Sequence, residues 1–160
     1  MPLHSAGILL YRLPNERLEL LLAHPGGPFW AGKDDGVWSI PKGLYDDTEE
    51  ALVAARREFH EEIGTRLDAP DDAFVSLGEL KQKGNKIVHA WAIEGDVDAA
   101  TIKSNTYAVQ WPKGTWRRYP EVDRAGWFGV DEARIKILPG QAAFIDRLLA
   151  VLDGLNPLDG

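Results

Sequence analysis

The chain has 160 residues, of which 44% are apolar and 27% charged, and its formal net charge at pH 7 is −7. These values predict one globular domain over residues 1–160, and the acidic balance argues against broad electrostatic binding to nucleic acid. The absence of cysteine excludes disulfides and thiol nucleophiles, and the lack of a long apolar run or a basic leader favours a cytoplasmic chain without membrane contact.

The first half of the chain predicts two strands, a loop and a long helix. Apolar runs indicate strands at residues 5–13 and 18–24, joined by a turn as a hairpin. The Gly-, Pro- and Asp-rich segment 24–36 is a candidate functional loop. A short strand is expected at residues 37–40, ended by Pro41.

The clearest helix is predicted over residues 48–63. Asp47, followed three residues later by Glu50, is typical of a capping box at its start, and Gly64 is a typical stop.

The second half predicts strands at residues 74–80 and 86–94, joined through a turn at 83–85. A Trp-rich, less regular stretch is expected at 106–119, followed by a strand at 124–130 and a final helix at 141–152. This order predicts an α/β protein of the α+β kind, with a mixed sheet covered by helices on both sides.

Three glutamates in the long helix break the rules that favour helix stability. Glu58, Glu61 and Glu62 have i, i+3 and i+4 spacing, so their carboxylates share one patch and repel each other by about 0.2–0.5 kcal/mol per pair. They also lie near the helix C-terminus, where the helix dipole disfavours negative charge. The competing interpretation is a solvated acidic face, but several broken rules at one place indicate a functional site. An apolar stripe anchors the same helix to the sheet; it comprises Leu52, Ala55, Phe59 and Ile63.

These glutamates belong to a longer pattern that resembles the Nudix box, G-x5-E-x7-R-E-U-x-E-E-x-G-U. Thr65 stands where the family has a bulky aliphatic residue, which affects local packing and not the chemistry. The box covers residues 43–65, and the strand order around it also resembles the Nudix fold. The matching positions are Gly43, Glu49, Arg57, Glu58, Phe59, Glu61, Glu62 and Gly64.

The resemblance implies a site for Mg²⁺, with Mn²⁺ as a substitute, since both ions prefer oxygen ligands. It implies Glu58, Glu61, Glu62 and the backbone carbonyl of Gly43 as metal ligands. Arg57 and Glu49 would orient the neighbouring carboxylates, and His60, at a variable position, is expected to be a bystander.

Outside the box, residues 119–128 resemble the segment that carries a further glutamate in diadenosine tetraphosphate hydrolases of the family. Glu121 is therefore a candidate metal ligand or general base, against the alternative of an exposed loop acid, and Asp123 is the fallback.

Residues 38–43 resemble the W-x-x-P-K-G motif of the same hydrolases, which implies that Lys42 contacts substrate phosphate. Lys81, Lys83 and Lys86 could reach the same cleft, although lysines at a strand edge are commonly protective.

Most of the six tryptophans are expected in the core, as large aromatic side chains usually are. Trp30, Trp111 and Trp116 lie in irregular segments and are candidates to stack on a nucleobase, as is Tyr119.

The resemblance implies a hydrolase of phosphorus-containing anhydrides, acting by water attack at phosphorus on a small-molecule nucleotide, as a monomer or a homodimer. Dinucleoside polyphosphates and nucleoside triphosphates are the leading substrates, followed by ADP-ribose and diphosphoinositol polyphosphates. A non-catalytic Nudix domain that senses a nucleotide is the alternative from another class.

Overall fold

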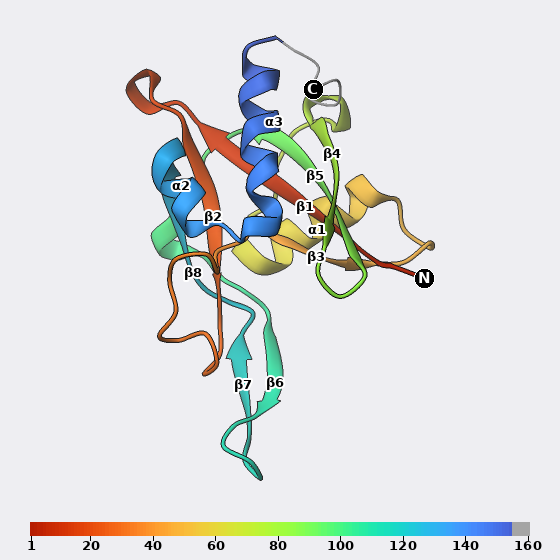
Figure 1. Cartoon of the computed structure of the whole chain (residues 1–160), viewed down its shortest axis with the longest axis vertical. Coiled ribbons are helices and arrows are strands. Elements are labelled where there is room, and N and C mark those ends of the chain that lie inside the picture. The colour runs from red at the N-terminus through yellow and green to blue at the C-terminus, as the bar shows by residue number, and fades with distance from the viewer. Residues whose placement is uncertain (155–160) are drawn as a thin grey trace.

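A computed structural model describes residues 1–154. These residues form a six-stranded mixed sheet with helices on both faces, and a separate two-stranded hairpin projects from one end (Figure 1). The order in the sheet is β4-β5-β1-β2-β8, with β3 paired to β1. The elements are β1 (Leu3–Arg12), β2 (Glu19–Pro25), β3 (Lys42–Tyr45), α1 (Ala51–Ile63), β4 (Val75–Gln82), β5 (Lys86–Glu94), β6 (Thr106–Gln110), β7 (Trp116–Pro120), β8 (Val122–Gly129), α2 (Val130–Lys136) and α3 (Ala142–Leu152).

Strand β1 lies in the middle of the sheet and pairs with three other strands. It pairs with β5 in parallel along most of its length, but with β2 only around Tyr11 and Arg12. Strand β3 takes the vacant edge of β1, where Gly7 faces Lys42, and Ser39 bridges to Ala23 of β2. The segment that leads into the Nudix-like box is therefore held between β1 and β2.

Two apolar clusters cover the two faces of the sheet, because neighbouring residues of a strand point to opposite sides. Leu9 and Leu22 pack with α3 on one face, whereas Leu10 and Leu21 pack with α1 on the other. The predicted stripe of α1 is confirmed: Ala55, Phe59 and Ile63 are buried, and Leu52 packs against the same cluster. No helix within residues 1–154 is long and apolar enough to cross a membrane.

The start of the predicted long helix is wrong by three residues. Helix α1 begins at Ala51, and its N-cap, Glu50, makes no side-chain capping bond, so the expected capping box is absent. The reason is local: the Asp46 carboxylate accepts the Thr48 N–H at 2.9 Å and holds the chain in a turn before the helix. Gly64 ends the helix as predicted, in the left-handed region at φ 89°.

Three other predictions are corrected. Residues 37–40 form turns and isolated bridges, and the strand starts only at Lys42. The stretch at 106–119 is a regular antiparallel hairpin, whose register runs from Thr106 opposite Pro120 to Gln110 opposite Trp116. Helix α2 was not predicted, since its seven residues are too few to show a helical period. The remaining strands and the final helix are confirmed within three residues.

Candidate functional site

The site is built around the point where β3 crosses the C-terminal half of α1. The backbone of Gly43 lies against the Glu58 carboxylate so closely that a side chain at residue 43 would overlap it. Only glycine allows this approach. The backbone N–H of Lys42 donates to Oε2 of Glu62 at 3.2 Å, so the strand is tied to two glutamates of the helix.

Burial distinguishes the three glutamates of the helix. Glu58 and Glu62 are 8% and 7% exposed, while Glu61 is half-buried. Burial raises the pKa of Glu58, against the hydrogen bond from Arg57. Burial raises the pKa of Glu62 to about 8, against the attraction of Lys42 and with the repulsion of Glu58. Ionising these two carboxyl groups in the metal-free protein therefore has a clear electrostatic cost, most of it from burial.

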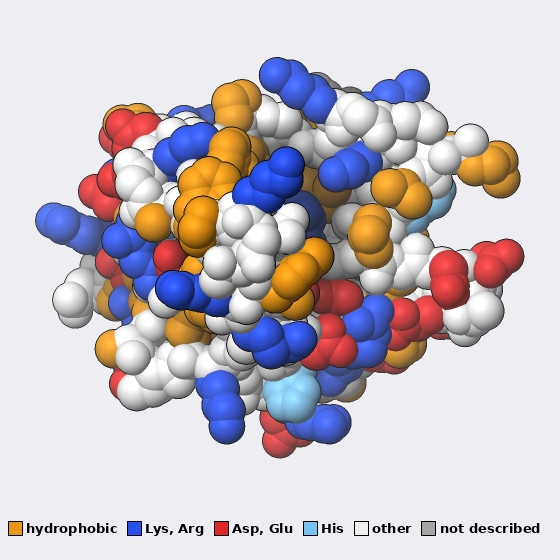
Figure 2. All heavy atoms as spheres, turned by 90° about the horizontal axis from the view of Figure 1, so that it is seen from below, with side chains coloured by type: hydrophobic (Ala, Val, Ile, Leu, Met, Phe, Trp, Pro, Cys, Tyr) orange, Lys and Arg blue, Asp and Glu red, His pale blue; other side chains and the backbone are white. Residues whose placement is uncertain are grey.

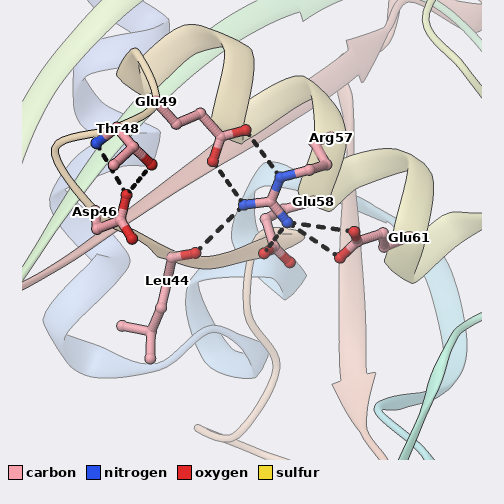
Figure 3. A network of polar contacts seen from close by, with 7 residues as sticks. All are labelled: Leu44, Asp46, Thr48, Glu49, Arg57, Glu58 and Glu61. Carbon is pink, nitrogen blue, oxygen red and sulfur yellow. Dashed lines mark hydrogen bonds and ion pairs between the residues drawn. The ribbon is translucent and has the colours of Figure 1, made fainter.

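Arg57 binds the carboxylates around it through the N–H groups at the edges of its guanidinium (Figure 3). Nε and Nη2 each donate to one oxygen of Glu49 at 2.9 Å, a bidentate pair. Nη1 donates to Oε1 of Glu58 at 2.8 Å and to both oxygens of Glu61 at 3.3 Å. This network raises the pKa of Arg57 and lowers that of Glu49. The geometry agrees with the orienting positions that the resemblance implied for Arg57 and Glu49.

Glu121 reaches the cluster from the opposite side of the site. A backbone ladder holds it there: Asn105 N–H donates to the Glu61 carbonyl at 2.8 Å, and Glu121 N–H donates to the Asn105 carbonyl at 2.9 Å. Burial and the charge of Glu61 raise the pKa of Glu121, and the charge of Lys42 lowers it. Glu121 is thus close to the box, although 59 residues separate it from Glu62 in the sequence.

Asp123, the fallback for Glu121, has a different partner. Its Oδ1 lies 2.8 Å from Nδ1 of His24, which is 1% exposed. The other ring nitrogen of His24 lies 2.7 Å from the carbonyl of Lys33, which can only accept, so Nε2 carries a proton. His24 therefore joins the loop at 24–36 to the segment that carries Glu121. No local sequence pattern indicated these contacts of His24, because its two partners lie 9 and 99 positions away.

The donor set suits a hard divalent cation, since it consists of carboxylates and a backbone carbonyl. Within residues 1–154, however, no three carboxylate or imidazole groups converge on one point. In this structure the Nη1 of Arg57 binds the carboxylates of Glu58 and Glu61.

A hollow of about 370 Å³ adjoins the carboxylates and is lined by Lys42, Lys81, Lys83 and Lys86, with no acidic residue. We call it the lysine pocket. Burial lowers the pKa of Lys42, and the charges of Glu62, Glu58 and Glu121 oppose this. The prediction that the lysines of the β4–β5 turn share a cleft with Lys42 is confirmed. Figure 2, which looks at the end from which the hairpin projects, shows Lys and Arg side chains beside carboxylates.

His60 lines a hollow of about 380 Å³ together with Arg56, Arg57 and Arg66, and not the lysine pocket. The guanidinium of Arg56 is already bound to Asp71 at 2.7 Å and to the Leu67 carbonyl at 2.9 Å. This placement agrees with the expectation that His60 is a bystander.

The tryptophans divide evenly between core and periphery, so the expectation that most are buried is wrong. Trp38 and Trp91 are buried, and Trp127 packs against the α1 core cluster. Trp111 and Trp116 stand on the projecting hairpin, 50% and 69% exposed.

Trp30 alone of the peripheral tryptophans lines a hollow next to Glu121, together with Tyr107. Tyr107, which the sequence analysis did not single out, lies directly opposite Tyr119 in the hairpin. Tyr107 and Val109 stand two residues apart and so lie on the same face of a strand, and this spacing was the available sequence signal for Tyr107.

A family model of the NUDIX domain matches residues 1–148. The chain belongs to the Nudix family. Members of this family hydrolyse pyrophosphate bonds and generally use divalent metal ions, and the Nudix box is residues 43–65 of this chain.

Solved structures of the family share this fold at low sequence identity. A C. elegans Ap4A hydrolase binary complex has a TM-score of 0.66 and 22% identity, covering 96% of this chain and 99% of that one. The NUDIX domain of Shewanella oneidensis NrtR, complexed with ADP ribose, has a TM-score of 0.65 and 14% identity over 95% of this chain and 89% of that one. A mutT/nudix protein from Listeria innocua has a TM-score of 0.63 and 18% identity, covering 96% of each. At these identities the likeness concerns the fold alone.

Proposed function

We propose that this Nudix protein is a Mg²⁺-dependent pyrophosphohydrolase of nucleoside polyphosphates, with dinucleoside polyphosphates or nucleoside triphosphates as substrates. The observation that carries the proposal is the lysine pocket beside the carboxylates of the box. Four lysines line this pocket and no acidic residue does, which in a chain of net charge −7 favours a ligand with several negative charges. A chain of phosphates has this property.

The ligands that we propose for Mg²⁺ are the carboxylates of Glu58, Glu61 and Glu62, the carbonyl of Gly43 and, from the opposite loop, Glu121. Bound Mg²⁺ supplies neutralisation of the diphosphate oxygens and lowers the pKa of a bound water. Mn²⁺ can substitute, because it prefers the same hard oxygen ligands.

The protein's own groups orient the carboxylates and accept the proton of the attacking water. Arg57, held by Glu49, orients the carboxylates of Glu58 and Glu61. If Glu121 does not bind Mg²⁺, its position beside the box suits the alternative role of taking this proton when water attacks phosphorus in line. Lys42 lines the lysine pocket while its backbone N–H binds Glu62, which supports a contact of its ammonium group with a substrate phosphate.

The test is a panel of nucleotides incubated with Mg²⁺, with the products resolved by mass: Ap4A, ATP, ADP-ribose and a diphosphoinositol polyphosphate. We expect cleavage of Ap4A or ATP, and loss of at least about 100-fold in kcat for Glu61→Gln and Glu62→Gln, since metal ligands are essential. Glu132→Gln, an exposed glutamate of α2, is the matched control. Full turnover in Glu62→Gln would refute the proposed metal site.

Two alternatives have specific outcomes in the same panel. Preferred cleavage of ADP-ribose or of the diphosphoinositol polyphosphate would replace the substrate assignment and leave the chemistry intact. Tight binding without turnover of any compound would favour a nucleotide sensor; the complete set of box carboxylates argues against this. Cytoplasmic location and a monomeric or homodimeric state stay predictions.

A further inference from the structure

The hairpin of β6 and β7 projects from one end of the molecule (Figure 1). We call residues 106–120 the arm. Its base is attached to the body, because the Tyr107 hydroxyl donates to the Gly26 carbonyl at 2.7 Å and the Val122 N–H donates to the Ser104 hydroxyl at 3.0 Å. Within residues 1–154, β6 and β7 pair only with each other, and no residue of the arm is buried.

The arm has no hydrophobic core of its own. Tyr107 and Tyr119 lie opposite each other near its base, but further out Val109 lies opposite Arg117, which is exposed. A two-stranded hairpin alone is at best marginally stable in water and needs a further strand or another element to pack against. Its two outer edges also present backbone groups that another chain can bind. These properties favour a partner that covers the arm.

Two tryptophans are exposed at the tip of the arm. Trp111 and Trp116 are 50% and 69% exposed, and they flank a turn in which the Trp111 N–H donates to the Thr115 carbonyl at 2.9 Å. Neighbouring large apolar side chains on a surface mark an interaction site, and tryptophan is enriched among the residues that dominate binding energy. The tip therefore has the composition of a protein interface.

The arm is basic, whereas the rest of the chain is strongly acidic. Lys113, Arg117 and Arg118 give the arm a charge of +3 without any Asp or Glu, so the rest carries −10, because the whole chain carries −7. Among the described residues 1–154, none of these three cations forms an ion pair. Figure 2 shows hydrophobic and basic side chains gathered on the end of the molecule from which the arm projects.

A second copy of this chain complements the arm better than a nucleic acid or an anionic membrane does. Either of these polyanions would be attracted by the arm and repelled by the acidic body of the same molecule. A second copy instead offers its own acidic body to the arm. It is also present wherever the protein is, as a hairpin without a core requires, and twofold homodimers are the commonest protein assemblies.

We propose that the arm is a dimerisation surface, which packs Trp111, Trp116 and Arg117 against the acidic body of a second copy. In a twofold dimer each copy gives its arm to the other, so the contact is made twice. This inference goes beyond the proposed function and does not depend on it.

The first experiment is sedimentation equilibrium of the full chain over about a 100-fold range of protein concentration. The wild type should have twice the mass of one chain. Trp116→Ser and Arg117→Glu should each weaken the dimer about 10- to 100-fold, as the loss of a central tryptophan or arginine does. The matched controls are Ile135→Ser, which removes a 59% exposed apolar side chain from α2, and Arg17→Glu, which reverses an exposed charge far from the arm in the sequence. Both controls should stay dimeric.

A cross-link tests the same contact without weakening it. Because the chain has no cysteine, Gln110→Cys provides a single attachment point for a photo-cross-linker on an exposed residue of the arm. In a mixture of ¹⁵N-labelled and unlabelled protein, we expect cross-links between a labelled and an unlabelled chain, from residue 110 to the body of the other copy.

Three results would overturn the proposal. The first is a monomeric wild type throughout the concentration range. The second is a dimer that Trp116→Ser and Arg117→Glu leave as stable as the controls do, since the two copies would then meet elsewhere. The third is a monomer that binds single-stranded oligonucleotides or anionic phospholipid vesicles and loses this binding in Arg117→Glu, since the arm would then serve a polyanion.

Discussion

Replacing Arg57 by lysine tests whether one guanidinium organises the carboxylates of the box. Lysine keeps the positive charge, but its three N–H donors sit on one nitrogen, whereas the planar fork of arginine spreads five N–H donors over three nitrogens. The bidentate pair with Glu49 and the contacts with Glu58 and Glu61 therefore cannot coexist in the variant.

The free energy lost in Arg57→Lys depends on how exposed each carboxylate partner of Arg57 is. The side chain of Glu58 is 10% exposed, and a buried acceptor left without its partner costs about 1–3 kcal/mol. The side chains of Glu49 and Glu61 are 22% and 37% exposed, so solvent screening limits their loss to about 0.2–1 kcal/mol each. If the cost at Glu58 raises the activation free energy of hydrolysis, because the carboxylate is no longer held in place, kcat falls about 10- to 100-fold for Arg57→Lys.

The assay is steady-state hydrolysis of the best nucleotide of the panel, with KM and kcat determined separately, beside thermal unfolding of each protein. Arg56→Lys is the matched control, since Arg56 precedes Arg57 on the same helix and binds Asp71 and the Leu67 carbonyl instead of the box. We expect a kcat loss only in Arg57→Lys, with both variants similarly folded. Equal kcat values for the two variants would refute the argument that Arg57 orients the carboxylates.

Three further predictions concern the site and its supports. Gly43→Ala should lower kcat about 100-fold, because its methyl group displaces the Glu58 carboxylate; an active, folded variant in the same assay would contradict this. In metal-free protein the raised pKa of Glu62 means that this group lowers stability as pH rises from about 4.5 to about 8, by on the order of 5 kcal/mol, and has no such effect at lower pH. Urea unfolding in EDTA at pH 5 and pH 9 should therefore show a smaller pH dependence for Glu62→Gln than for the wild type, and identical slopes would contradict the assignment. His24→Ala should lower the free energy of unfolding by about 1–3 kcal/mol and speed amide exchange in residues 25–36 and 119–124, because Asp123 and the Lys33 carbonyl lose their partner; unchanged exchange there would exclude the link.

Local patterns predicted most of the elements and the centre of the site. Apolar runs located five strands of the main sheet, all except β3. Helical spacing placed Glu58, Glu61 and Glu62 on one patch, and the crossing of β3 over α1 then explains why residue 43 is glycine. The start of α1 escaped prediction because a single Asp46 side chain, and not an average propensity, decided where the helix begins.

The sequence by itself determined the family, the helix that carries the glutamates and the residues on its two faces, since each depends on spacings within one turn or one motif. Only the tertiary structure decided which distant groups share the site. Glu121 approaches the box through a ladder of backbone bonds, and His24 meets Asp123 across 99 residues of sequence. The lysine pocket likewise joins β3, the β4–β5 turn and residues 138–141, whose contacts follow from how the sheet folds and leave no trace in local periodicity.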